Sequence, residues 1–180
     1  MLRNSLARYG LVSVFLHWTT ALLIIALFVL GLWMVSLDYY HDWYHRAPAL
    51  HKSIGLLLAA LWLVRLCWRC VDCLPAAEAN MLVWERRLAL WMHRLFYLLV
   101  FALLLTGYLI PTAENAGIDF FGLFEVPAIW PIFEQQADVA GWLHWALAWL
   151  LMFCALLHTT AALRHHFYHR DRTLLKMLGR

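Results

Sequence analysis

The chain has 180 residues, and its ten histidines are the residues that best indicate a chemical function. Five of them stand in long apolar stretches, where an ionisable side chain is costly and by default marks a functional site: His17, His51, His93, His144 and His158. These stretches contain no Asp or Glu. A proton relay or cation path built on carboxylates therefore lacks its usual groups, and histidine alone is better suited to the iron of a haem.

The spacing of the last two of these histidines is the sharpest indication. His144 and His158 are fourteen residues apart, which on a helix is ~21 Å of rise and close to four full turns. Both imidazoles then face the same way, one near each surface of a membrane, where the irons of two stacked haems would need them. Each iron then needs a second axial ligand at a matching depth on another helix.

Three histidines compete for these two positions. His51 begins an apolar stretch on the side of His144, and His17 lies about two turns into the first stretch on the side of His158. The depth of His93 is close to that of His17, so depth alone does not decide between them. We predict the ligand pairs His51 with His144 and His17 with His158. For any single membrane histidine, the alternative is an interhelical hydrogen bond.

His93 is not used as a ligand in this prediction, and Arg94 directly follows it. Arginine is the better partner for a carboxylate, so we expect His93 and Arg94 to meet a haem propionate or a quinone oxygen. Gly31, Gly55 and Gly107 also lie within apolar stretches. They allow either close helix packing or room for the face of a porphyrin.

The elements that must hold these residues are membrane-spanning helices. The chain is 64% hydrophobic and only 14% charged, and its mean hydropathy is +0.68, which excludes a water-exposed globular domain. A span needs roughly 20 apolar residues, and four stretches qualify, at about residues 11–37, 48–68, 88–110 and 139–163. We predict an all-α integral membrane four-helix bundle that forms a single domain over residues 1–180. The first stretch is too long for the apolar region of a signal peptide.

The distribution of Lys and Arg predicts the orientation, because cytoplasmic loops retain positive charge. Only Arg46 and Lys52 fall on one side. The other twelve fall on the side of both termini: Arg3, Arg8, Arg65, Arg69, Arg86, Arg87, Arg94, Arg164, Arg170, Arg172, Lys176 and Arg180. We therefore expect both termini in the cytoplasm. The basic bias reports topology and does not support nucleic-acid binding.

The segments outside the spans carry further expectations. Pro111 is expected to end the third helix, and the aromatic-rich connection over residues 111–138 to lie along the outer interface, as an anchor or as a lid over a cofactor or quinone pocket. Arg65 is expected to snorkel from the end of its span. The tail from Arg164 to Arg180 is expected to form a membrane-surface helix.

Three cysteines form a C-x-x-C-x-x-C run, at Cys67, Cys70 and Cys73. Three thiolates do not complete a metal cluster or a tetrahedral site, and neither pair is followed by the histidine of covalent haem attachment. We expect these thiols to be reduced in the cytoplasm and assign them no chemistry.

Four segments resemble the bacterial cytochrome b561 family: RYGLVSVFLHW, WYHRAPALHKSIG, LHWALAWLLMFCALLH and DRTLLKML. Their order and spacing agree with that family over essentially the whole chain. The resemblance implies a four-helix bundle in the bacterial inner membrane with two noncovalent b haems, held by the positions matched by His17, His51, His144 and His158. It also implies electron transfer linked to a quinone such as ubiquinone. One branch of the family oxidises superoxide at the outer face.

Two classes of function follow. The first is an oxidoreductase that exchanges electrons between quinone and a periplasmic donor such as superoxide; Lys52 and Arg46 would then form an anion entrance or hold propionates, or else simply anchor their helix. The second is a haem-bearing membrane subunit that links a separate dehydrogenase or hydrogenase to quinone. A histidine-based metal transporter is disfavoured, because the spans lack paired acids. A homodimer is compatible with either class.

Overall fold

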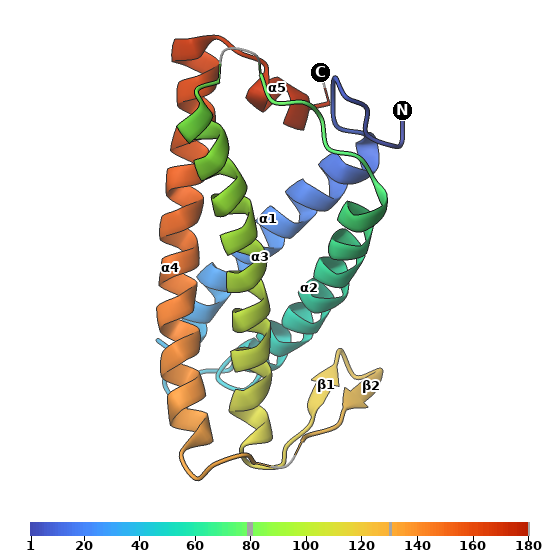
Figure 1. Ribbon diagram of the computed structural model, residues 1–180. Coiled ribbons are helices and arrows are strands. Elements are labelled where there is room, and N and C mark those ends of the chain that lie inside the picture. Colours follow the sequence, from blue (N-terminus) through green and yellow to red (C-terminus); the bar gives the residue numbers. More distant parts are fainter. Residues whose placement is uncertain (79–80, 130, 180) are drawn as a thin grey trace.

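The computed structural model describes residues 1–78, 81–129 and 131–179. Four long helices dominate this part of the chain: α1 (Leu11–Met34), α2 (Arg46–Val71), α3 (Val83–Thr112) and α4 (Gln136–Arg164) (Figure 1). Each is long and apolar enough to cross a membrane. The predicted helical architecture with four spans is therefore confirmed.

The helices pack as two pairs. α3 packs most extensively against α4, and α1 against α2, whereas α2 and α3 meet at few points. Leu99, Val100, Leu151 and Cys154 form the buried core of the α3–α4 pair. Many large apolar side chains, including Phe15 and Phe153, point outward instead, as expected for helices whose solvent is lipid.

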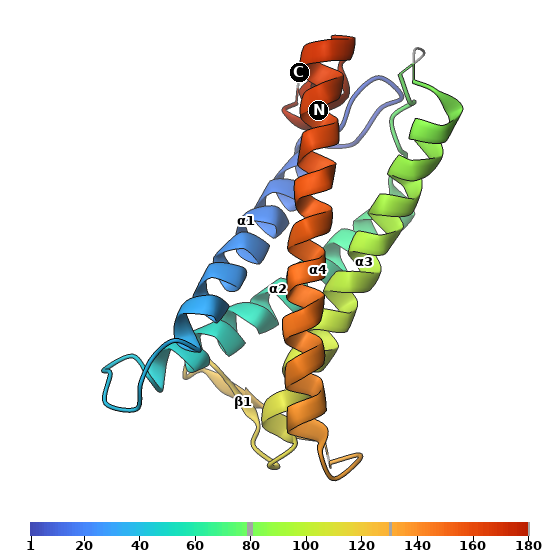
Figure 2. The same cartoon turned by 90° about the vertical axis from the view of Figure 1, so that its left-hand side faces the viewer.

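Both chain termini lie at one end of the bundle, as the two perpendicular views agree (Figures 1 and 2). We call this the terminal end. The opposite end carries a small antiparallel hairpin of β1 (Ile118–Phe120) and β2 (Phe124–Val126), and we call it the hairpin end.

The β-hairpin was not expected from the sequence. Its turn contains Phe121 (φ 53°) and Gly122 (φ 73°), both left-handed, a conformation that glycine adopts without steric cost. The hairpin is fastened to α2 by Ser53, whose hydroxyl lies 3.0 Å from the carbonyl oxygen of Asp119 and accepts the N–H of Phe121 at 3.2 Å. The connection thus packs onto the bundle two residues from His51.

α3 is longer than predicted at both ends. It begins at Val83 because the carboxylate of Glu85 accepts the N–H of Leu82 at 3.2 Å, a helix-capping contact. It continues through Pro111 to Thr112, so the expectation that Pro111 ends the helix was wrong. A proline inside a helix removes a backbone donor and crowds the carbonyl four residues earlier, and here only one further helical residue follows it. The helices as observed therefore include acids at their ends, Glu85 on α3 and Asp138 on α4.

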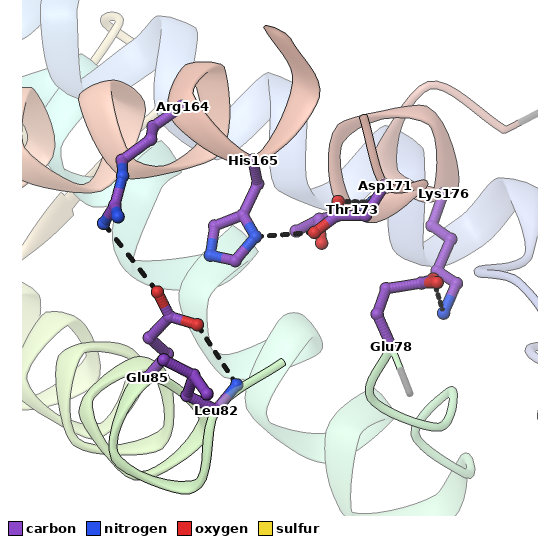
Figure 3. A network of polar contacts seen from close by, with 8 residues as sticks. All are labelled: Glu78, Leu82, Glu85, Arg164, His165, Asp171, Thr173 and Lys176. Carbon is purple, nitrogen blue, oxygen red and sulfur yellow. Dashed lines mark hydrogen bonds and ion pairs between the residues drawn. The ribbon is translucent and has the colours of Figure 1, made fainter. Parts of the chain in front are cut away.

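The C-terminal tail is not one surface helix, which corrects that expectation. α4 runs on into a π-helical turn (His165–His169); the chain then reverses at Arg170 (φ 52°) and forms the short helix α5 (Thr173–Met177). Asp171 holds the reversal together, because its carboxylate lies 2.6 Å from Nδ1 of His165 and accepts the N–H of Thr173 at 2.9 Å (Figure 3).

The same tail packs over the other segments of the terminal end. Lys176 pairs with Glu78 (Figure 3). Its ammonium group also donates to the carbonyl of Ala76 at 2.9 Å. The indole N–H of Trp18 donates to the carbonyl of Met177 at 2.9 Å. These contacts tie α5 to α1 and to the segment between α2 and α3.

Candidate functional site

Two of the predicted ligands meet at the hairpin end. The rings of His51 on α2 and His144 on α4 have centroids 6.2 Å apart and an interplanar angle of 73°. Imidazoles on opposite sides of one metal have ring centres about 6 Å apart, because each metal–nitrogen bond is about 2 Å and each ring centre lies about 1 Å beyond its nitrogen. The pair thus fits the two axial positions of a haem iron.

The second nitrogen of His144 is held by α3. Its Nδ1 lies 3.1 Å from the carbonyl oxygen of Leu103 and 3.1 Å from Oγ1 of Thr106. The Thr106 hydroxyl lies 2.8 Å from the carbonyl of Ala102, its shortest acceptor contact, so an oxygen lone pair is free to face the ring. His144 is therefore placed to donate from Nδ1 and to leave Nε2 for a metal, as metal-binding histidines usually do.

Two glycines let these rings lie close to neighbouring helices. A Cβ at Gly107 on α3 would come 3.1 Å from Cε1 of His144, and one at Gly31 on α1 would come 3.3 Å from Cε1 of His51. A Cβ at Gly55 would meet nothing within 4 Å. Within the part of the chain that the structure describes, Nδ1 of His51 is buried and has no hydrogen-bond partner.

The terminal end holds the other three membrane histidines. His158 on α4 makes ring contacts with His93 on α3, at a centroid distance of 5.5 Å, and with Phe96 at 5.4 Å. His17 on α1 instead turns its Nδ1 toward Nη2 of Arg65, at 3.1 Å. The ligand pair of His17 with His158 therefore stays a prediction, and His93 lies beside the same site.

Arg65 is placed differently from the expectation. Its guanidinium does not extend away from the bundle but reaches His17 and lies 5.7 Å from the ring centroid of Tyr97. It lines a pocket at the terminal end together with Arg69 and His93. An arginine inside a span was the signal for this placement, because such a charge usually faces the bundle interior.

Lys52 and Arg94 are the two other predicted contact residues, and each directly follows a membrane histidine in the sequence. Lys52 lines a pocket of about 500 Å³ at the hairpin end, together with Tyr44 and His45. Arg94 is exposed, and its guanidinium lies 5.3 Å from the ring centroid of Trp91. Its proposed contact with a propionate or quinone has no support from this position.

The three cysteines of the C-x-x-C-x-x-C run do not form a metal site in the described residues. Cys67, Cys70 and Cys73 are all free and exposed. Within residues 1–78, 81–129 and 131–179, no group of three or more His, Cys, Asp or Glu side chains is arranged to hold a metal ion.

Comparison with known proteins decides the family. A family model described as prokaryotic cytochrome b561 matches residues 8–180. The chain belongs to the prokaryotic cytochrome b561 family. It is 44% identical to cytochrome b561 homolog 2 of Escherichia coli (strain K12), over 98% of this chain and 94% of the relative. It is 25% identical to cytochrome b561 homolog 1 of the same organism, over 96% and 98% of the two chains.

A third relative is named for an enzymatic activity. The probable superoxide oxidase CybB of Yersinia pestis is 30% identical over 95% of this chain and 96% of its own. Membership of the cytochrome b561 family makes the chain a multi-pass bacterial membrane cytochrome that carries b-type haem and transports electrons. The resemblance noted from the sequence is thereby confirmed.

Several contact residues had no recognisable sequence signal. Thr106 holds the ring of His144 from 38 positions away in the chain, and Ser53 fastens the hairpin from 66 positions away. Thr and Ser in spans usually bond to their own helix, so their longer-range partners depend on how the helices pack.

Proposed function

We propose that this protein holds two b haems, one at each end of the bundle, and passes electrons between the quinone pool and a donor on the opposite side of the membrane. The observation that carries the proposal is the opposed pair His51 and His144, with Nδ1 of His144 bound by α3. Two imidazoles at this separation, one of them with its Nδ1 held and its Nε2 left over, are suited to an iron.

When bound, a b haem supplies one-electron exchange at its iron. His51 and His144 would hold this haem through their imidazoles, and a haem held by two histidines would serve electron transfer. The carbonyl of Leu103 on α3 would hold the proton of His144 on Nδ1.

A second haem is proposed at the terminal end, with His17 and His158 as ligands. His158 shares α4 with His144, and their spacing corresponds to ~21 Å along the helix axis. The ring of His93 lies against His158. We assign His93 a neighbouring role, in contact with a quinone oxygen or with the cofactor edge, because it is the third histidine at a two-ligand site.

The proposed orientation puts the terminal end in the cytoplasm and the protein in the inner membrane. It is supported by the position of twelve of the 14 Lys and Arg residues on the side of the termini, since positive loops are retained in the cytoplasm. The hairpin end then faces the periplasm.

Superoxide is the proposed donor at the hairpin end. The name of the Yersinia pestis relative motivates this choice, and Lys52 supplies a cation beside His51, in a pocket open to the outside. One nearby cation gives local steering of a small anion, although the acids of the outer segments oppose it at longer range.

The deciding experiment is haem quantitation with a reduced-minus-oxidised spectrum on the purified protein and on single alanine variants of the five membrane histidines. Wild type should carry two haems per chain. The variants of His17, His51, His144 and His158 should each lose one, and His93→Ala should keep both. One haem in wild type, or a haem lost with His93→Ala in place of His17→Ala, would overturn the proposed ligand set.

The donor is tested separately in proteoliposomes that contain ubiquinone. Superoxide generated outside the vesicles should reduce the haems and then the quinone, and Lys52→Gln should slow haem reduction by roughly threefold through the loss of one steering charge. Exposed Arg87→Gln is the matched control. Reduction at the same rate without superoxide would exclude this donor.

A further inference from the structure

The pocket at the terminal end contains two arginines that point into the bundle. The guanidinium carbons of Arg65 and Arg69, one turn apart on α2, lie 5.7 and 5.6 Å from the ring centroid of Tyr97. Both arginines, Tyr97 and His17 line this pocket. Two positive charges thus share one aromatic ring beside a predicted iron ligand.

No carboxylate of the described residues forms an ion pair with either arginine. Asp72 lines the same pocket, but its two oxygens accept the backbone N–H groups of Asn4 at 3.0 Å and of Cys73 at 3.1 Å. Among residues 1–78, 81–129 and 131–179, neither Arg65 nor Arg69 has an acidic oxygen within 4.0 Å. Paired burial of like charges at membrane depth is costly, so the pocket is complementary to an anion.

The contact between Arg65 and His17 also indicates that Arg65 needs an anionic partner. A guanidinium can only donate, so Nδ1 of His17 must accept in this arrangement. A histidine that binds iron through Nε2 normally carries its proton on Nδ1 and donates from it. Arg65 therefore has to leave His17 when His17 becomes a ligand, and it needs another acceptor within reach.

A neutral donor completes the pocket. Tyr9 lines it near the chain's N-terminal segment, and burial raises the pKa of the Tyr9 hydroxyl. This hydroxyl therefore stays protonated at neutral pH. Two guanidinium groups and a phenol form a donor set that suits a carboxylate, since arginine binds carboxylates through two parallel hydrogen bonds.

We propose that Arg65 and Arg69 bind a propionate carboxylate of the haem at the terminal end, and that Arg65 moves from His17 to this carboxylate when the haem is bound. The inference rests on the proposed second haem. The same anionic chemistry could come from the phosphate of a lipid, and the experiments below separate the two sources.

The first experiment measures the midpoint potential of the terminal-end haem alone, in the holoprotein with His51→Ala, which is expected to lack the other haem. A cation near a haem stabilises its reduced form, because reduction adds a negative charge. Arg65→Gln should shift the equilibrium toward the oxidised form by about tenfold, which is about 59 mV for a one-electron couple. Arg65→Lys should restore most of the shift, and Arg87→Gln should cause none.

An unchanged potential in Arg65→Gln would overturn the proposal. If Arg65→Gln retains no haem, Arg69→Gln is titrated in its place and should give a shift of the same sign. Absence of any haem in the His51→Ala protein would instead mean that the proposed second haem is wrong, so the two failures are distinguishable.

The second experiment removes the carboxylates from the haem and compares the chain that keeps both arginines with Arg65→Gln. The His51→Ala chain, produced without haem and reconstituted in detergent, is titrated with protohaem and with its dimethyl ester. The terminal-end site should bind the ester at least about tenfold more weakly, and Arg65→Gln should abolish this discrimination. Equal affinity for haem and ester would overturn the propionate proposal and favour a lipid phosphate.

Discussion

The histidines at the two ends of the bundle are held by different kinds of contact. At the hairpin end, His51 and His144 already oppose each other, and neutral groups of the chain hold them: two glycines, a threonine and a backbone carbonyl. At the terminal end, three histidines and two arginines lie in one region, and Arg65 donates a hydrogen bond to Nδ1 of His17.

The difference lies in charge. Neutral contacts can be satisfied within the chain, so a site built from them is preorganised. A site that contains uncompensated guanidinium groups needs an anion before its side chains reach their working positions. We therefore expect the hairpin-end site to be formed before cofactor binding and the terminal-end site to rearrange on binding.

The largest expected effect tests whether the two sites are independent. His144→Ala removes a proposed haem ligand and should eliminate the proposed hairpin-end haem completely, while the terminal-end haem keeps its spectrum. Haem quantitation and low-temperature difference spectra measure this. Loss of both haems with intact helical circular dichroism would show that the ends are coupled, contrary to the comparison.

A smaller effect tests preorganisation by the glycines. Gly107→Ala places a methyl group 3.1 Å from Cε1 of His144, so the ring must shift, and we expect roughly tenfold weaker retention of the hairpin-end haem. Gly55→Ala is the matched control, because its Cβ would meet nothing within 4 Å. Retention is measured by competition with apomyoglobin, and equal retention in the two variants would contradict the role of Gly107.

A more modest effect tests the support from α3. Thr106→Val removes the hydroxyl 3.1 Å from Nδ1 of His144 and leaves the carbonyl of Leu103 in place. The loss of one hydrogen bond of about 1 kcal/mol should weaken retention of the hairpin-end haem roughly fivefold. The terminal-end haem, measured in the same sample, serves as the internal control.

The smallest effect concerns the tail over the terminal end. Burial acts to raise the pKa of Asp171, but hydrogen bonds from Thr173 and His165 outweigh it, so the folded-state pKa lies below the ordinary value. Asp171 therefore favours the docked tail above the ordinary carboxyl pKa of about 4, and this contribution is lost as the pH falls through the lower folded-state pKa.

Hydrogen exchange of the tail amides measures this contribution. At pH 7, Asp171→Asn should speed exchange of residues 173–177 a few-fold relative to wild type. The ratio of the two rates should approach one at acidic pH, where both side chains are neutral. A ratio that is independent of pH would show that Asp171 acts through its shape and not its charge.

Much of the architecture follows from the sequence. Apolar stretches of more than roughly 20 residues can only be helices in a bilayer, because lipid offers no partners for backbone groups. The four helices were therefore predicted, and the errors fell at their ends, where Glu85 caps α3 early and Pro111 is accommodated in its last turn. The β-hairpin and the folded tail were missed because left-handed residues such as Phe121 and Arg170 carry no composition signal.

For the candidate site, too, some features follow from the sequence and others only from the tertiary structure. Position along a helix is linear in residue number, at about 1.5 Å per residue, so the sequence determined the depth of the five membrane histidines and hence that His51 and His144 lie at similar depths. Which faces meet depends on how each helix is rotated against its neighbours. Only the tertiary structure could therefore decide that Thr106 holds His144, that His93 touches His158 and that Arg65 turns inward to His17.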